Sequence, residues 1–217
     1  APEAPTIETR PAALSNSASA TIAFSGEADA TFTCSLDGGS YAACTSPRSL
    51  DGLSDGDHTF SVKATDLAGN TGEAATASWN VDTAAPDAPA VTSRPGTLVN
   101  SATASVAFTA EAGAAVTCSV DRGTFAICES PLALTGLSDG SHSVLIKETD
   151  AAGNVSAGST VSWTVDRTAP GAPNLTGRPA TLANSAAASI AFTAEQGAST
   201  TCSVDGGAFS ACQSPFT

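Results

Sequence analysis

The amino-acid sequence predicts an all-β protein made of tandem β-sandwich repeats, and three observations support this fold class. The six cysteines lie at 34, 44, 118, 128, 202 and 212, so that each pair recurs after 84 residues. Apolar and polar residues alternate along short runs, as they do in a strand with one buried face. Clusters of Gly, Asp and Asn separate the runs at intervals of about 8 to 12 residues, which is typical of a β-sandwich.

The strands of the first repeat can be placed from their apolar positions, which fall two residues apart. The clearest runs predict strands at 20–24, 32–36, 60–64 and 77–81. Turn-forming residues separate them at 26–27, 37–39, 54–56 and 66–70. No stretch shows the apolar stripe of a helix. We therefore expect about seven short strands in each repeat.

The repeat predicts three domains, at 1–85, 86–169 and 170–217, and the last of them is truncated. Each linker carries two prolines, which favour extended backbone and a short, semi-rigid connection. The third repeat lacks the counterpart of residues 50–82, so Ile190, Phe192 and Val204 are expected to be exposed. Either the protein continues beyond Thr217 or another chain supplies the missing strands by β-augmentation.

Composition excludes several classes of partner. The net charge is −13 and the eight basic residues are scattered singly, which argues against binding of nucleic acid or of an anionic membrane surface. No apolar run approaches the roughly 18 residues that span a bilayer, so membrane insertion is not expected. The abundance of small residues predicts small cores made of Val, Ile, Leu, Ala and a few aromatic side chains.

The cysteines predict one disulfide within each repeat, because each pair flanks a turn segment at a constant separation. The expected pairs are Cys34–Cys44, Cys118–Cys128 and Cys202–Cys212. A zinc site is the alternative, but each pair lacks a nearby histidine or a second cysteine pair, and there is no C-x-x-C. A disulfide in every repeat indicates an oxidising compartment, outside the cell or at its surface.

His58 and His142 stand two residues before a core position at the start of a late strand. Immunoglobulin sandwiches carry a tyrosine at this position, whose ring is tied back to upstream backbone. We expect the two histidines to take the same structural role. A metal-binding or catalytic role is disfavoured because no second histidine lies within either repeat.

Three segments carry a resemblance to a known family: Cys34 to Cys44, Asp55 to Asn70, and Val81 to Pro86. They resemble the bacterial immunoglobulin-like (BIg-type) tandem repeats of large secreted and surface adhesin-like proteins. The second repeat matches throughout and the third as far as it extends. The resemblance implies immunoglobulin-like sandwiches, and it implies little about the parent protein because such repeats serve as spacers in many contexts.

Acidic residues recur at fixed positions, and the immunoglobulin-like topology would gather several of them where two repeats join. Calcium suits such oxygen-rich sites, and in some adhesins that these repeats resemble it stiffens the joint. The predicted ligands at the two joints are Asp55, Asp82, Glu111, Asp150, Asn154, Asp139, Asp166 and Glu195. The alternative is that these side chains only form turns, since Asp before Gly is a turn former. No dense Asp-x-Asp-x-Asp calcium loop is present, and no cofactor other than calcium is expected.

Three functions remain open from the sequence, and none of them is enzymatic, since no catalytic motif is present. The first is a rigid stalk or spacer of a bacterial surface or adhesin protein. The second is a subunit of an extracellular filament or sheath, assembled by strand exchange or lateral packing. The third is a glycan- or surface-binding module, for which Tyr41, Phe125 and Phe209 are the available aromatic residues. The expected partners are neighbouring repeats of the same or an identical chain, with a cell-surface or host ligand bound through other parts of the protein.

Overall fold

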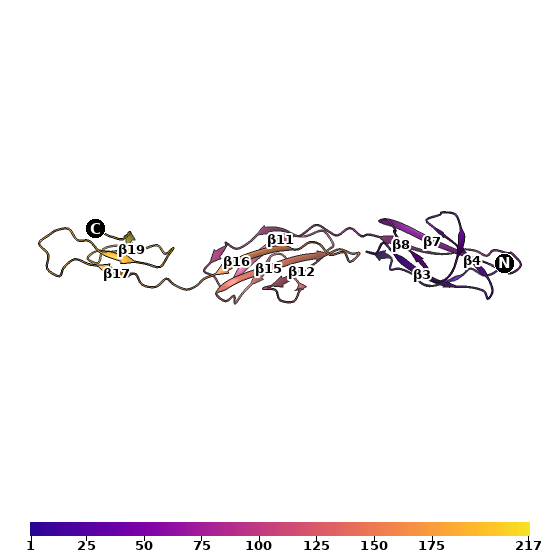
Figure 1. The fold of residues 1–217 in the computed structure, drawn as a ribbon, viewed down its shortest axis with the longest axis horizontal. Coiled ribbons are helices and arrows are strands. Elements are labelled where there is room, and N and C mark those ends of the chain that lie inside the picture. Colours follow the sequence, from indigo (N-terminus) through magenta and orange to yellow (C-terminus); the bar gives the residue numbers. More distant parts are fainter. The chain divides into compact units, whose positions relative to one another are not determined.

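The computed structural model describes residues 1–217, and every regular element in it is a β-strand. Residues 1–165 form one compact unit and residues 166–217 another, and each is described here by itself (Figure 1). The structure contains no helix long and apolar enough to cross a bilayer. The predicted boundaries at 85/86 and 169/170 remain predictions from the sequence repeat.

The first unit begins with eight strands that form a two-layer sandwich, called here the first sandwich. They are β1 (Thr6–Thr9), β2 (Leu14–Ser15), β3 (Ala20–Ser25), β4 (Thr31–Leu36), β5 (Ala42–Cys44), β6 (Arg48–Leu50), β7 (Gly56–Thr65) and β8 (Ala75–Val81). One sheet has the order β1-β3-β6 and the other the order β2-β8-β7-β4-β5. All neighbours are antiparallel except β2 and β8, which run parallel.

The second sandwich repeats this arrangement with its own eight strands. They are β9 (Ala90–Ser93), β10 (Leu98–Val99), β11 (Ala104–Thr109), β12 (Ala115–Val120), β13 (Ala126–Ile127), β14 (Leu132–Leu134), β15 (Gly140–Thr149) and β16 (Ser159–Val165). Its sheets have the orders β14-β11-β9 and β10-β16-β15-β12-β13, and β10 runs parallel to β16. The sequence prediction of all-β sandwiches is therefore confirmed.

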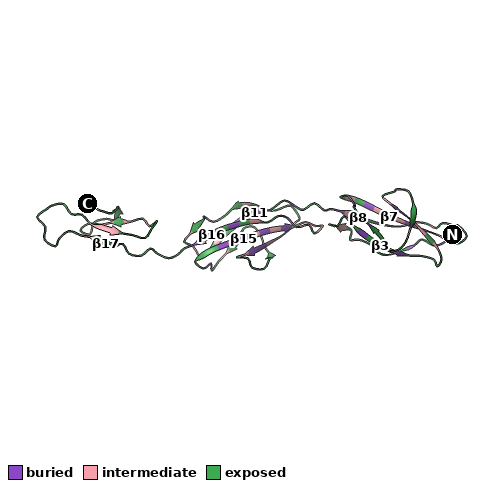
Figure 2. Cartoon of the chain, in the orientation of Figure 1, coloured by how far each residue is buried: buried purple, intermediate pink, exposed green.

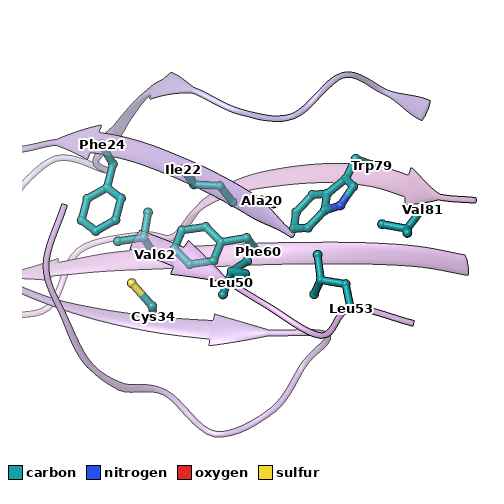
Figure 3. Close-up of a cluster of buried hydrophobic side chains, with 10 residues drawn as sticks. All are labelled: Ala20, Ile22, Phe24, Cys34, Leu50, Leu53, Phe60, Val62, Trp79 and Val81. Atoms are coloured by element: carbon teal, nitrogen blue, oxygen red, sulfur yellow. The ribbon is translucent and has the colours of Figure 1, made fainter. Parts of the chain in front are cut away.

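Each sandwich encloses its own core, because alternate residues of the strands point between the two sheets. In β7, His58, Phe60, Val62 and Ala64 are buried while the residues between them are partly exposed. Figure 3 shows Phe24, Phe60 and Val62 packed together in the first core, with Trp79 at the other end of the cluster. The second core repeats the pattern, and the buried positions of both sandwiches stand out along β7, β8, β15 and β16 (Figure 2).

The C-terminal unit has four short strands and no counterpart of β7 and β8. They are β17 (Asn174–Gly177), β18 (Ala191–Thr193), β19 (Thr201–Cys202) and β20 (Ser210–Ala211). They pair as β17-β18 and β19-β20. Val204 is 57% exposed, as the sequence predicts.

The prediction that Ile190 and Phe192 are exposed is wrong, because both side chains are half-buried. Ile190 forms a β-bridge with Phe216, and Phe192 lies opposite Leu175 in the β17–β18 pair. These local contacts cover part of the apolar surface even without a second layer of strands.

Candidate functional site

The predicted disulfides are all present, and each joins the two strands of a short hairpin. Cys34–Cys44 links β4 to β5, Cys118–Cys128 lies at β12 and β13, and Cys202–Cys212 lies at β19 and β20. No free cysteine remains. The same clasp therefore occurs in both complete sandwiches and in the C-terminal unit.

His58 ties together three segments of the first sandwich. Its Nδ1 donates a hydrogen bond of 2.8 Å to Oδ2 of Asp37, in the turn after β4. Its Nε2 donates another, also of 2.8 Å, to the carbonyl oxygen of Ser54, in the loop before β7. The ring is 6% exposed and packs against Trp79 with 5.7 Å between the ring centroids. The predicted tie to upstream backbone is confirmed.

His142 has the same environment in the second sandwich, with Asp121 and the Ser138 carbonyl as acceptors at 2.8 Å each. An ionised carboxylate and a backbone carbonyl can only accept hydrogen bonds. The imidazole must therefore donate from both ring nitrogens, which it can do only in its protonated form. The hydrogen bond to the Ser138 carbonyl, followed by the one to Asp121, raises the pKa of His142 above its usual value. The Ser54 carbonyl and Asp37 likewise raise the pKa of His58.

The aspartate partners of the histidines were not predicted from the sequence. Burial acts to raise the pKa of Asp37, but hydrogen bonds from the Thr59 N–H and from His58 outweigh it and hold the pKa below its usual value. Asp37 lies 21 residues before His58, so only the fold brings the two together. The available signal was the recurrence of an Asp at this turn position in Asp121 and Asp205.

The joint between the first two sandwiches is a network of hydrogen bonds to the linker. Oδ1 of Asp55, in the loop before β7, accepts hydrogen bonds from the backbone N–H of Thr83 at 2.9 Å and from its hydroxyl at 2.8 Å. The carboxylate of Asp82 accepts a hydrogen bond from the Ala84 N–H at 3.1 Å. Two of the predicted carboxylates thus hold the start of the linker in place.

The second sandwich holds the same linker from the other side. Nδ2 of Asn154 donates hydrogen bonds of 2.8 Å to the carbonyl oxygen of Asp82 and to Oδ2 of Asp150. Oδ1 of Asp150 accepts the N–H groups of Gly153 and Asn154, at 2.7 and 2.8 Å, and so closes the loop after β15. The Asn154 side chain, ahead of the backbone contacts, holds the pKa of Asp150 below its usual value.

The loop that carries Asn154 has a counterpart in the first sandwich. There the Asp66 carboxylate accepts two hydrogen bonds from Asn70, one from its backbone N–H at 2.8 Å and one from its Nδ2 at 2.9 Å. The loop is therefore preformed by its own residues. What distinguishes Asn154 from Asn70 is the additional hydrogen bond to Asp82.

The remaining predicted calcium ligands make separate contacts. The Glu111 N–H donates to the buried Glu148, Asp166 accepts the Thr168 N–H at 3.0 Å, and Glu195 accepts the Gly171 N–H at 3.2 Å. Asp139 lies in the loop before β15. No group of three or more His, Cys, Asp or Glu side chains lies close enough to hold a metal ion. A calcium site at Asp55, Asp82, Asp150 and Asn154 stays a prediction. In this structure the carboxylates of Asp55, Asp82 and Asp150 accept hydrogen bonds from N–H and O–H groups of the chain.

The chain was compared with known protein families, curated proteins and solved structures. No protein-family profile matches the chain, and no curated protein matches it. Among solved structures, it is similar to fibronectin(III)-like modules of Clostridium thermocellum CbhA, with 15% identity and a TM-score of 0.49 over 74% of this chain and 93% of that one. It is also similar to part of a 1.5-MDa bacterial ice-binding adhesin, with 18% identity and a TM-score of 0.37 over 82% of this chain and 68% of that one. At these values we draw no conclusion from either similarity.

Proposed function

We propose that this chain is a non-enzymatic, extracellular array of immunoglobulin-like sandwiches that acts as a stiff spacer in a bacterial surface protein of the adhesin type. The observation that carries the proposal is the hydrogen-bonded joint between the first two sandwiches. Asp55 of the first sandwich and Asn154 of the second hold consecutive residues of the linker, Thr83 and Asp82. A linker held from both sides has fewer accessible conformations than a free one.

The sequence of the linker supports the same interpretation. Pro86 and Pro89 restrict the backbone immediately after the held residues. The carbonyl oxygen of Pro89 accepts a hydrogen bond of 2.6 Å from the Ser159 hydroxyl of β16, so the far end of the linker is also attached. The linker is therefore hydrogen bonded at both ends, at Asp82 and Thr83 and again at Pro89, and proline restricts the backbone between them.

The proposed location and the absence of catalysis rest on side-chain chemistry. Three disulfides persist only in an oxidising compartment, which supports a place outside the cell. The two histidines would be the natural general bases, but both are buried and both ring nitrogens of each are engaged. The BIg-type assignment is part of this proposal and rests on the sequence resemblance.

Nuclear relaxation of the full chain tests the stiff joint. We expect the amides of the first and second sandwiches to report one common rotational diffusion tensor. Asn154→Ala removes the bond to Asp82 and should let the two sandwiches tumble more independently. Asn70→Ala is the matched control, because it disrupts the equivalent loop without touching a linker. Independent tumbling of the two sandwiches in the unaltered chain would refute the proposal.

A filament subunit is the second candidate, favoured by the exposed apolar side chains of the C-terminal unit. Leu175, Val204 and Phe209 are 62%, 57% and 74% exposed. Light scattering of the full chain distinguishes the candidates, since a spacer stays monomeric and a filament subunit forms concentration-dependent polymers. The same measurement, together with relaxation, in calcium and in a chelator tests the calcium prediction, which fails if neither quantity changes.

A further inference from the structure

One arginine of the second sandwich adopts a backbone conformation that the other two repeats assign to glycine. Arg122 has φ 62° in the turn after β12, while its counterparts Gly38 and Gly206 have φ 71° and 75°. The left-handed region is open to glycine and is disfavoured for a residue with a Cβ. The other repeats show that glycine fits this turn position without strain. An arginine in the same unfavourable conformation therefore suggests that its side chain has a function.

The guanidinium of Arg122 is available to a ligand. It makes no ion pair and no hydrogen bond within the chain, although the protein carries a net charge of −13. Asp121 lies beside it, but both oxygens of Asp121 are occupied, Oδ2 by His142 and Oδ1 by the Ser143 N–H at 2.8 Å. Acidic residues elsewhere on the chain act weakly here, because the screening length is about 8 Å at physiological ionic strength.

Arg122 borders two open depressions on the outer face of the β12–β15–β16 sheet. The first has a volume of about 540 Å³, and its lining includes Ser141, Ser143, Ser162 and Thr164. Asp121 also lines it, with its side chain 43% exposed and its carboxylate paired with His142. The second has a volume of about 450 Å³, shares Arg122, Ser143 and Ser162, and adds the apolar side chains of Phe125 and Leu145. Volumes of about 300 to 1,000 Å³ are typical of small-molecule sites. We call this surface the hydroxyl face.

A second cation stands at the apolar end of the hydroxyl face. The ammonium group of Lys147 lies 5.7 Å from the centroid of the Phe125 ring. Lys147 belongs to the outward-pointing set of β15, since it alternates with buried residues of that strand. The face therefore combines two cations, a series of hydroxyl groups, one aromatic ring and the Asp121 carboxylate, which is paired with His142.

The corresponding surface of the first sandwich keeps a lysine over an aromatic ring, with Lys63 4.7 Å from the Tyr41 centroid, but it lacks the arginine and two of the hydroxyl groups. Glycine stands at 38 in place of Arg122, and Asp57 and Asn80 stand in place of Ser141 and Thr164. Asn80 donates a hydrogen bond of 2.8 Å to Asp57, so a carboxylate occupies this part of the surface. The first sandwich thus carries two carboxylates here, Asp37 and Asp57, where the second carries only Asp121, and the additional negative charge would repel an anionic ligand.

We propose that the hydroxyl face of the second sandwich binds an acidic saccharide, a glycan that carries a carboxylate. Arg122 binds the carboxylate through paired hydrogen bonds, for which a guanidinium has matching geometry. The serine and threonine hydroxyls exchange hydrogen bonds with the sugar hydroxyls, and Phe125 with Leu145 covers the apolar C–H face of a ring. The first sandwich does not bind this ligand.

Titration of the full chain with trigalacturonic acid tests the proposal, with the neutral maltotriose as the comparison ligand. Chemical shifts of backbone amides and of the Arg122 side chain report the site. We expect saturable changes at Arg122, Ser141, Ser143 and Ser162 with the acidic trisaccharide, and about tenfold weaker binding or none with the neutral one.

The variants exploit the difference between the two sandwiches. Arg122→Gly restores the residue of the other repeats, so it should unfold at an equal or higher temperature while binding falls about tenfold or more. Ser141→Asp, which installs the carboxylate of the first sandwich, should also abolish binding. The pair Gly38→Arg with Asp57→Ser should create a second site and raise the stoichiometry from one to two.

Arg94→Gln is the matched control, because it removes an exposed positive charge from the same sandwich outside the hydroxyl face. It should leave binding unchanged, and equal losses in Arg94→Gln and Arg122→Gly would show nonspecific charge attraction and overturn the proposal. Equal binding of the two trisaccharides, or no binding of either, would also overturn it. So would concentration-dependent self-association that Arg122→Gly removes, since the partner would then be a second copy of the chain.

Discussion

The second sandwich and the C-terminal unit begin with closely related sequences but reach different degrees of burial. Phe108 is 5% exposed, whereas its counterpart Phe192 is only half-buried. Phe125 is 46% exposed and its counterpart Phe209 is 74% exposed. Both units contain the same disulfide. The disulfide and the hairpin are thus local structures, whereas burial of the apolar face depends on β15 and β16, which the C-terminal unit lacks.

The largest loss of stability is expected when the packing of β15 against the apolar face is weakened. Ile146 of β15 is fully buried, and Ile146→Ala should destabilise the second sandwich by about 2 to 5 kcal/mol through lost burial and a cavity. Denaturant unfolding can follow each sandwich separately, because the only tryptophans, Trp79 and Trp163, lie one in each. In a Trp79→Phe background the transition of the second sandwich should shift.

Leu145→Ala is the control for this prediction, since Leu145 is the half-buried neighbour on the outer face. It should cost much less than Ile146→Ala. Equal losses for the two variants would show that the inner layer of β15 does not dominate the stability of the second sandwich.

Removing the disulfide should have different effects in the second sandwich and in the C-terminal unit. Replacing Cys118 and Cys128 by Ser opens a loop with a sequence separation of 10, which should lower the stability of the second sandwich by about 2 to 3 kcal/mol. The same replacement at Cys202 and Cys212 should leave both tryptophan transitions unchanged, because the C-terminal unit forms a separate compact unit. A shift of either transition in the second variant would contradict this independence.

The pairs His58–Asp37 and His142–Asp121 should make the stability of the two sandwiches depend on pH. The pKa of His142 is raised in the folded state, so its contribution is complete below its unfolded value of about 6.5 and is lost as pH rises through the folded pKa. The pKa of Asp121 is lowered, burial being outweighed by the hydrogen bonds from His142 and the Ser143 N–H, so its contribution is complete above about 4 and is lost as pH falls further. The pair therefore stabilises most between about pH 4 and 6.5.

His142→Gln tests this dependence, with an expected loss of about 1.5 kcal/mol at pH 5.5 and a smaller loss at pH 8.5. The measurement is the free energy of unfolding across this range, again in the Trp79→Phe background. A constant difference between His142→Gln and the parent at all pH values would show that the ring acts only through packing.

Much of this fold follows from local signals in the sequence. The alternation of Ile22 and Phe24 with polar neighbours predicts the strand β3, and the ten-residue separation of Cys34 and Cys44 predicts the clasped hairpin. The position of His58 before a core residue predicts a tie to upstream backbone, and the structure shows that the partner is the Ser54 carbonyl. Each of these signals depends on residues that are near one another in the chain.

The features that escaped prediction depend on distant contacts. Phe216 lies 26 residues after Ile190, so the pattern around Ile190 alone could not show that it is half-buried. Asp55 lies 28 residues from Thr83 and Asn154 lies 72 residues from Asp82, and neither hydrogen bond was predicted. For Arg122 the sequence shows only that an arginine replaces the glycine of the other repeats. The structure adds that this arginine has a positive φ angle, which is unfavourable for a residue with a Cβ.

The parallel pairing of β2 with β8 determines how the first sandwich responds when its two ends are pulled apart, as the proposed spacer role would require. A pull on the two ends of the first sandwich acts on β2 through its N-terminal side and on β8 through its C-terminal side. Because the strands run parallel, the pull slides them along each other and loads their hydrogen bonds, including Asn80 N–H to Ala13 and Asp82 N–H to Ser15, all at once. The bonds must break together rather than one after another. The second sandwich has the same arrangement, with Thr164 N–H bound to Thr97, so each module should resist extension until its whole clamp yields.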